Sequence, residues 1–373
     1  MKSLYLRPIA FADSPQSEEG GAARLAGGLV YASRFAVIVR EGARIVSRTR
    51  VGADDIAKAL AQLPDDLAAE GEAQWSNLRL VHPPLERGTR TIRLDQPQIM
   101  GILNVTPDSF SDGGKFLDNP DEVNAHAAAM LEAGAALVDV GGESTRPGAA
   151  AVWEGDERKR VIPAVERLVA SGAAVSIDSR RASVIEAALA AGAQVVNDVS
   201  ALRHDPRSAE LVARAGVPVV LMHAPGAQEV GGASDLHADG RYTDVVLDVF
   251  DWLAERRDAA IAAGILREKI VLDPGIGFGK TLAENLALLN ALPLFHALGQ
   301  PLLLGASRKR MIGALSHEAA AHKRLGGSLL LAARAMDAGV QLLRVHDVAE
   351  TVQARDVWRG LRDAALTDFA QLP

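Results

Sequence analysis

From residue 98 onward, short apolar runs alternate with longer amphipathic segments. Such unbroken apolar runs are typical of parallel strands that are buried on both faces. A helix is predicted between each pair of runs, for example over Asp121–Ala133, with Pro120 at its start and Gly134 at its end. The apolar runs occupy residues 99–103, 136–140, 174–178, 194–198, 217–222, 270–273, 301–304 and 342–345.

This repeat predicts an α/β fold, a (β/α)8 TIM barrel over residues 98–373. The span is close to the ~250 residues typical of such a barrel. An open doubly wound sheet is built from the same units, but it places a glycine-rich phosphate loop after the first strand. Here Thr106-Pro107-Asp108-Ser109-Phe110 follows that strand. The pattern therefore favours the barrel.

Residues 1–97 have a different pattern, which predicts a small accessory α/β extension of unknown role. Strands are expected over 4–11 and 36–39, a helix over 53–63, and a polar loop over 64–72. Thr89–Leu94 is expected to be a strand that plugs or edges the barrel.

Composition narrows the function classes. The chain has no cysteine, which excludes disulfides, thiolate zinc sites and cysteine nucleophiles. Its net charge of -7 argues against a broad nucleic-acid surface. No stretch approaches the ~18 apolar residues of a membrane span, and polar residues interrupt the N-terminal apolar segment, as a signal peptide would not allow. A cytoplasmic protein with no membrane or nucleic-acid partner is expected.

Polar residues follow nearly every predicted strand. In a parallel barrel all strand carboxyl ends face one rim, where active sites are built. One polar residue there is explained as a local cap, but a full ring predicts a binding site, because buried polar groups need partners. The ring comprises Asn104, Glu143 to Arg146, Asp178, Asn197, Asp198, Met222, His223, Asp273, Ser307 to Lys309, Arg344 and His346.

The ring divides by chemistry. Asp178, Asn197 and Asp273 suit a flat heterocycle with several N–H donors. The cationic members suit a phosphate or a carboxylate; they are Arg146, Arg308, Lys309, Arg344 and His346. Asn104, with the loop carboxylates Asp108 and Asp112, offers oxygen ligands for a hard divalent ion beside a diphosphate.

Other polar residues have plainer interpretations. Asp139 is expected to be a buried structural carboxylate, and Arg180 and Arg181 to begin a surface helix. Gly275–Lys280 resembles the end of a P-loop, but the required glycine position holds Pro274, so the motif fails. His223 is interpreted as structural or phosphate-binding rather than as a zinc ligand.

Seven motifs in order resemble one family. They are Ile99–Gly114, GGESTRPG (141–148), VSIDS (175–179), VVNDVS (195–200), LDPGIGFGK (272–280), GASRKRMIG (305–313) and RVHDV (344–348). Together they resemble the dihydropteroate synthases. The resemblance implies an SN1-like condensation of 6-hydroxymethyl-7,8-dihydropterin diphosphate with p-aminobenzoate in folate biosynthesis, with Mg2+ as cofactor and a homodimer as the assembly.

The resemblance also implies roles for individual residues. The pterin would be bound by Asp178, Asn197, Met222, Asp273, Phe278, Lys309 and Arg344. The diphosphate would be bound by Asn104, Thr145, Arg344 and His346, with Asn104 as the metal ligand. The p-aminobenzoate site would comprise Phe110, Thr145, Arg146, Pro147, Phe278, Ser307 and Lys309. Asp178, Lys309, Arg146 and Asp112 would be catalytic.

Two alternatives stay open at this point. A pterin-dependent methyltransferase shares the barrel and the pterin-binding carboxylates, and a non-catalytic pterin-binding paralogue shares the fold. The chain departs from the usual family pattern at Ser179, where threonine is common, and after His223, where Ala224-Pro225-Gly226 leads into a long loop.

Overall fold

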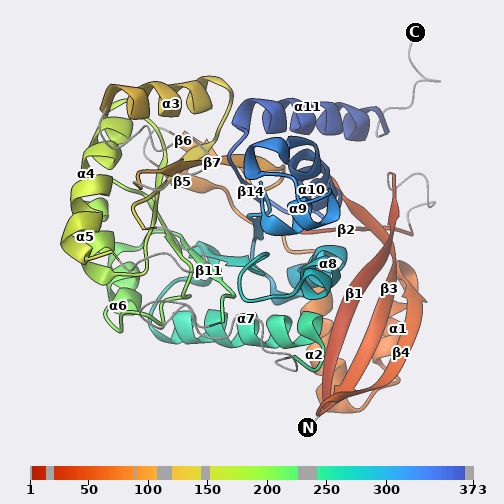
Figure 1. The fold of residues 1–373 in the computed structure, drawn as a ribbon. Coiled ribbons are helices and arrows are strands. Elements are labelled where there is room, and N and C mark those ends of the chain that lie inside the picture. Colours follow the sequence, from red (N-terminus) through yellow and green to blue (C-terminus); the bar gives the residue numbers. More distant parts are fainter. Residues whose placement is uncertain are drawn as a thin grey trace.

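The computed structural model describes residues 2–13, 21–87, 90–106, 120–143, 152–225 and 242–365. Eight parallel strands of the described chain form one sheet in the order β12-β11-β10-β9-β8-β7-β14-β13 (Figure 1). The predicted strand set is confirmed. The strands are β7 (Gln98–Asn104), β8 (Leu137–Gly141), β9 (Val175–Asp178), β10 (Val195–Asp198), β11 (Val219–Met222), β12 (Ile270–Asp273), β13 (Leu303–Leu304) and β14 (Leu342–Val345).

The sheet closes on itself between β12 and the residues just before β13. The Leu272 N–H of β12 donates to the Pro301 carbonyl at 3.0 Å, and Leu272 and Leu302 form a parallel bridge. This contact joins the two ends of the strand order, so the sheet is a barrel. Closure removes the edges that an open sheet would expose.

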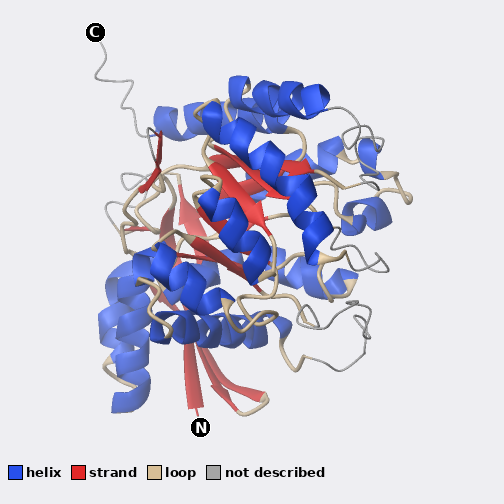
Figure 2. Cartoon of the chain, turned by 90° about the vertical axis from the view of Figure 1, so that its left-hand side faces the viewer, coloured by secondary structure: helices blue, strands red, loops and turns tan. Residues whose placement is uncertain are grey.

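Helices enclose the barrel strands, as Figures 1 and 2 show. The barrel helices are α3 (Pro120–Glu132), α4 (Glu154–Ala170), α5 (Ala182–Ala190), α6 (Ser208–Ala215), α7 (Val245–Ala262), α8 (Leu282–Asn290), α9 (Arg310–Leu315), α10 (Leu325–Asp337) and α11 (Val348–Ala365). The helix predicted over Asp121–Ala133 is confirmed as α3, with each end shifted by one residue. No helix in the described ranges is long and apolar enough to cross a membrane.

A hairpin plugs the end of the barrel where the strands begin. Strands β5 (Leu85–Arg87) and β6 (Arg90–Ile92) pair antiparallel. Leu85, Ile92 and Leu94 form one buried cluster with a residue from, or directly before, each barrel strand. Those residues are Met100, Leu137, Ala174, Val195, Val220, Val271, Leu303 and Leu342. The plug expected over Thr89–Leu94 is therefore present, in the form of a hairpin.

The N-terminal unit, defined as the described part of residues 2–78, is an antiparallel sheet covered by helices. Its strands are β1 (Lys2–Ala12), β2 (Ala23–Arg24), β3 (Tyr31–Glu41) and β4 (Arg44–Gly52), with β3 between β1 and β4. Its helical segments are η2 (Ala53–Asp55), α1 (Ile56–Leu60) and α2 (Asp65–Leu78).

The loop expected over residues 64–72 is wrong, because α2 occupies Asp65–Leu78. Asp65, Asp66 and Glu72 lie on the exposed face of α2, while Leu67 and Leu78 are buried and Glu70 accepts from the Leu4 N–H of β1. Gln74 is also buried: its amide accepts from the Leu6 N–H and donates to the Leu4 carbonyl. These bonds satisfy backbone N–H and carbonyl groups on the outer edge of β1, as a neighbouring strand would.

The N-terminal unit packs against the barrel mainly through the 3-10 helix η4 (Leu292–Leu298), and polar side chains connect it to α7. The Tyr5 hydroxyl donates to Asp251 at 2.9 Å, and Arg40 forms ion pairs with Asp248 and Asp251. On α2, the Asn77 amide donates to the Ala297 carbonyl at 2.9 Å. The hydrophobic cores of the two parts are continuous.

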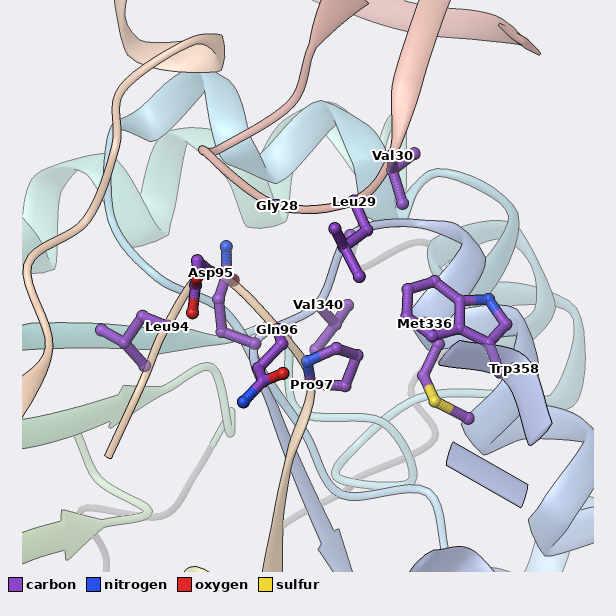
Figure 3. A pocket seen from close by; sticks show the side chains of 12 residues that line it. Gly28, Leu29, Val30, Leu94, Asp95, Gln96, Pro97, Met336, Val340 and Trp358 are labelled. Carbon is purple, nitrogen blue, oxygen red and sulfur yellow. The ribbon is translucent and has the colours of Figure 1, made fainter. Parts of the chain in front are cut away.

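A small, partly open pocket lies between the N-terminal unit and the barrel. Residues 28–30, the connection 94–97 and helices α10 and α11 line it, with Met336 and Trp358 on the helical side (Figure 3). It lies beside Pro97 and Gln341, where β7 and β14 begin. The pocket is therefore at the opposite end from the ring of polar strand ends.

Candidate active site

The strand register aligns several predicted site residues at the rim, by which we mean the carboxyl ends of the barrel strands. Asn104 of β7 pairs with Gly141 of β8, Gly141 pairs with Asp178 of β9, and Asp178 pairs with Asn197 of β10. Gly141 lies between Asn104 and Asp178 in this register, and because it has no side chain the two polar side chains face each other across it. A Cβ placed on it would lie 3.4 Å from Asn104 Oδ1 and 3.6 Å from Asp178 Oδ2.

Arg344 connects three of the barrel strands at this rim. Its Nε donates to Asp139 Oδ2 at 2.6 Å and its Nη2 donates to Asp178 Oδ2 at 2.7 Å. Asn197 Nδ2 donates to the same Asp139 oxygen at 3.0 Å. Asp139 has no exposed surface, so its charge is stabilised only by such partners. The guanidinium therefore holds two carboxylates and, through Asp139, the Asn197 amide.

Burial changes the acidity of the two carboxylates that the sequence predicts to bind the heterocycle. It raises the pKa of Asp178 to about 7, against the opposing charge of Arg344. It raises the pKa of Asp273 to about 6, although the Gly275 N–H and the Lys309 ammonium favour the ionised form. Raised pKa values in a cluster of charged groups are typical of a functional site.

Lys309 and Phe278 meet on the other side of the rim. The Lys309 Nζ lies 4.0 Å from the centroid of the Phe278 ring, a cation–π contact. A Cβ placed on Gly277 would be 3.0 Å from Lys309 Cδ, so the lysine stem lies against that glycine. Phe278 also packs against the small apolar cluster of Val199, Met222 and Ala224. Met222 is the register partner of Asp273. These contacts bring Lys309, Phe278, Met222 and Asp273 to one part of the rim.

Ser307 and His346 are in direct contact. The Ser307 Oγ lies 3.1 Å from His346 Nδ1 and accepts from the His346 backbone N–H at 3.2 Å. Ser307 therefore fixes the ring of His346 at the end of β14. The neighbouring Arg308 forms an ion pair with Asp347, which directs its guanidinium to that carboxylate.

The expectation that Arg180 and Arg181 lie on a surface is wrong. Their side chains are only 11% and 12% exposed, and both form ion pairs with Glu143. Arg181 also pairs with Glu157 of α4, which is fully buried. Glu143 accepts from the Val152 N–H at 3.3 Å as well, so one carboxylate joins β8, the start of α5 and residue 152. The partners of these arginines come from distant segments, so the local sequence did not reveal their burial.

Seven predicted site residues lie outside the described residues; they are Asp108, Phe110, Asp112, Ser144, Thr145, Arg146 and Pro147. The described part of the rim holds Asn104, Asp178, Asn197, Met222, Asp273, Phe278, Ser307, Lys309, Arg344 and His346. Their roles in ligand binding stay predictions.

Asp139 is fully buried in the middle of β8, so the expectation of a buried structural carboxylate is confirmed. It also contacts two predicted site residues, Arg344 and Asn197, which the sequence pattern does not identify as its partners. A carboxylate in the middle of the apolar strand Leu137–Gly141 was the available indication. Such a residue needs a buried cation, and Arg344 is one that reaches it.

Comparison with known proteins assigns the chain to a family. A family model described as "Pterin binding enzyme" matches residues 100–346. Over 265 residues the chain is 48% identical to the dihydropteroate synthase of Mycobacterium leprae, a match that covers 70% of this chain and 92% of that protein. The chain belongs to the dihydropteroate synthase family.

Solved structures of dihydropteroate synthases have the same fold. The enzyme of Yersinia pestis, in a complex with a sulfonamide drug, matches with a TM-score of 0.70 at 43% identity, covering 75% of this chain and 99% of that one. The enzyme of Xanthomonas albilineans, with 4-aminobenzoic acid, matches with a TM-score of 0.68 at 45% identity, covering 79% of this chain and 100% of that one. The TIM-barrel prediction is confirmed.

Proposed function

We propose that this chain condenses 6-hydroxymethyl-7,8-dihydropterin diphosphate with p-aminobenzoate to give 7,8-dihydropteroate and diphosphate. It is a transferase of folate biosynthesis. The observation that carries this function is the rim arrangement of Asp178, Asn197 and Asp273 beside Lys309 and Arg344, in a chain of the dihydropteroate synthase family. The relative that holds 4-aminobenzoic acid supports the second substrate.

The chemistry of the rim supports this pair of substrates. A pterin presents a flat ring with several N–H groups, and carboxylates accept charge-assisted hydrogen bonds from such donors. We assign pterin binding to Asp178, Asn197, Met222, Asp273, Phe278, Lys309 and Arg344. We assign diphosphate binding to Asn104, Thr145, Arg344 and His346, and p-aminobenzoate binding to Phe110, Thr145, Arg146, Pro147, Phe278, Ser307 and Lys309.

The proposed reaction is an SN1-like alkyl transfer. The bond between the pterin methylene carbon and the diphosphate oxygen breaks, and the oxygen keeps the electron pair. The remaining cation is delocalised into the pterin, where the Asp178 carboxylate stabilises it. The amine nitrogen of p-aminobenzoate then bonds to the methylene carbon and loses a proton to water. Lys309, Arg146 and Asp112 are the other residues to which we assign catalytic roles.

Asn104 fits a contact to Mg2+ that arrives with the diphosphate. Within the described ranges, no three His, Cys, Asp or Glu residues are grouped to hold a metal. Mg2+ takes few protein ligands where phosphate oxygens and waters complete its octahedron, so an amide oxygen at the end of β7 is a suitable donor. When bound, the ion neutralises charge on the leaving diphosphate.

Residues 1–97 form, in this proposal, an accessory segment, and residues 98–373 form the catalytic barrel. The N-terminal unit contacts α7 and η4, and the pocket beneath it lies where the strands begin. We also propose that the enzyme is a cytoplasmic homodimer. Light scattering of the purified chain tests the assembly, and a mass corresponding to one chain would contradict it.

Diphosphate release tests the proposed function directly. The pterin diphosphate is supplied with and without p-aminobenzoate and Mg2+, to the native enzyme and to Lys309→Ala. Release that requires both additions and collapses in the variant is expected. Bound pterin without turnover would instead indicate a non-catalytic paralogue or a methyltransferase.

The role of Asp178 has a separate test. Asp178→Asn keeps the size of the side chain and loses its charge, so it should reduce kcat as well as pterin affinity. Full kcat with only weaker pterin binding would contradict the proposed electrostatic role.

A further inference from the structure

Lys280 is buried at the rim although it contributes to none of the assigned binding contacts. Its residue is only 4% exposed. Its Nζ donates to three backbone carbonyls: His223 at 3.1 Å, Gly275 at 2.8 Å and Phe278 at 3.1 Å. An ammonium group has three donors, so three carbonyls can engage all of them. The side chain therefore faces the backbone rather than an external phosphate, as the failed P-loop motif also indicates.

These bonds join two parts of the rim that are remote in sequence. His223 follows β11, whereas Gly275 and Phe278 lie in the loop after β12, residues 274–279. The two backbones are very close, since a Cβ placed on Gly275 would lie 1.9 Å from the His223 carbonyl oxygen. Gly275 also has a φ of +69°, a conformation that favours glycine. Lys280 bridges the carbonyls of this crowded junction.

Asn285 of α8 holds the same loop from the other side. Its Oδ1 accepts from the Gly277 N–H at 2.6 Å, and its Nδ2 donates to the Lys280 and Thr281 carbonyls at 3.1 and 2.7 Å. Asn285 is 3% exposed. Two buried side chains thus fix the backbone of the loop, and neither is among the residues to which a binding role is assigned.

The loop carries the residues against which Lys309 rests. The Phe278 ring lies 4.0 Å from Lys309 Nζ, and Gly277 contacts the lysine stem. The Phe278 carbonyl is itself one of the three Lys280 acceptors. The backbone position of Phe278, and with it the place of the Lys309 ammonium, therefore depends on Lys280.

We propose that Lys280 is a positioning residue that acts through Phe278: it fixes loop 274–279 so that Phe278 places the Lys309 ammonium for the condensation. The inference rests on the proposed synthase activity. Lys280 itself contacts no substrate, and its ammonium adds to a backbone hydrogen bond within the loop, in which the Phe278 N–H donates to the Gly275 carbonyl at 3.2 Å. A displacement of the loop by about 1 Å is enough to lower kcat/KM by up to ~100-fold.

A double-mutant cycle between Lys280 and Phe278 tests the proposal. Lys280→Met, Phe278→Ala and the double variant are compared in steady-state diphosphate release. If Lys280 acts through Phe278, Lys280→Met lowers kcat/KM by ~10- to 100-fold, and the double variant is no worse than Phe278→Ala alone. Lys323→Met, at an exposed position, is the matched control and should behave as the native enzyme.

Two results would overturn the proposal. One is a Lys280→Met enzyme that melts earlier but keeps native kcat and KM, which describes a purely structural lysine. The other is full additivity, in which the two single effects multiply in the double variant. Absence of diphosphate release by the native enzyme would instead reject the synthase activity, so the two failures are distinguishable.

Asn285→Ala provides a second cycle if Lys280→Met does not fold. It removes the other side-chain support of the loop and leaves the Lys280 ammonium in place. Non-additivity with Phe278→Ala is expected here too. Independent effects in this cycle would show that loop 274–279 does not act through Phe278 and would also contradict the proposal.

Discussion

The two ends of the barrel bury opposite kinds of side chain. At the rim, charged groups from several strands are buried together, and Arg344 stabilises Asp139 and Asp178. At the other end, a hairpin closes the barrel through a cluster of buried apolar side chains. Burial of apolar side chains at the plugged end stabilises the fold. Burial of charged groups at the rim costs their hydration free energy, which only ion pairs and hydrogen bonds between those groups offset. The comparison indicates that the rim is built for ligand binding and the plugged end for stability.

The largest expected effect comes from removing the central cation of the rim. Arg344→Met leaves Asp139 and Asp178 buried without their common partner. Activity should fall by ~10³-fold, and the free energy of unfolding should fall by about 3 to 5 kcal/mol. Diphosphate release and urea unfolding measure the two losses. Arg334→Met, at a side chain 64% exposed, is the matched control and should change neither.

A change in the plug should affect stability alone. Ile92 is 1% exposed in the apolar cluster at the strand starts. Ile92→Ala should lower the free energy of unfolding by about 2 to 5 kcal/mol through lost burial and a cavity, with KM for both substrates unchanged. Val81→Ala, at a residue 65% exposed, is the control. A large rise in KM for Ile92→Ala would contradict the conclusion that the plugged end serves stability and not ligand binding.

Two buried histidines near the plugged end make stability depend on pH. Burial lowers the pKa of His296 to about 4 and that of His82 to about 3, so both are neutral in the folded state. Because the unfolded chain binds their protons near the ordinary pKa of 6.5, stability is full above pH 6.5 and falls as the pH decreases toward 4. The loss for His296 should be about 3 kcal/mol.

Urea unfolding at pH 7, 5.5 and 4 measures this dependence. His296→Gln keeps a donor for the Ala338 carbonyl, which His296 Nε2 contacts at 2.9 Å, and removes the titration. The variant should lose less stability than the native enzyme between pH 7 and 4. The exposed His322→Gln is the control. Parallel curves for native and His296→Gln enzymes would show that this histidine does not contribute.

The smallest effect concerns the contact between the N-terminal unit and α7. Arg40→Met removes the ion pairs with Asp248 and Asp251, whose side chains are 27% and 43% exposed. Solvent screening limits the expected loss to about 1 kcal/mol, and kcat should not change. Arg48→Met on the exposed strand β4 is the control. A loss of kcat in Arg40→Met would contradict the accessory role of this segment.

Much of the fold and of the site follows from local pattern. The period of apolar runs predicts the barrel, and the polar residue at each strand end predicts the rim. Asp178 and Asn197 are register partners on neighbouring strands, and Asn104 is separated from Asp178 only by Gly141. They lie side by side because the strands are parallel and each ends near this register. The pattern does not predict helix α2, because polar residues, Glu70 and Gln74, face the sheet where apolar residues would mark a buried helix face.

The sequence by itself determined which residues reach the rim, since strand periodicity is a local property of the chain. Only the tertiary structure decided how they are paired. Arg181 is buried because Glu143 and Glu157 pair with it, and Asp139, in the middle of β8, is connected to the rim because Arg344 reaches it. Lys280 supports Phe278 because the His223 carbonyl lies beside Gly275. The burial of a charge depends on partners that are distant in sequence, and only folding brings those partners together.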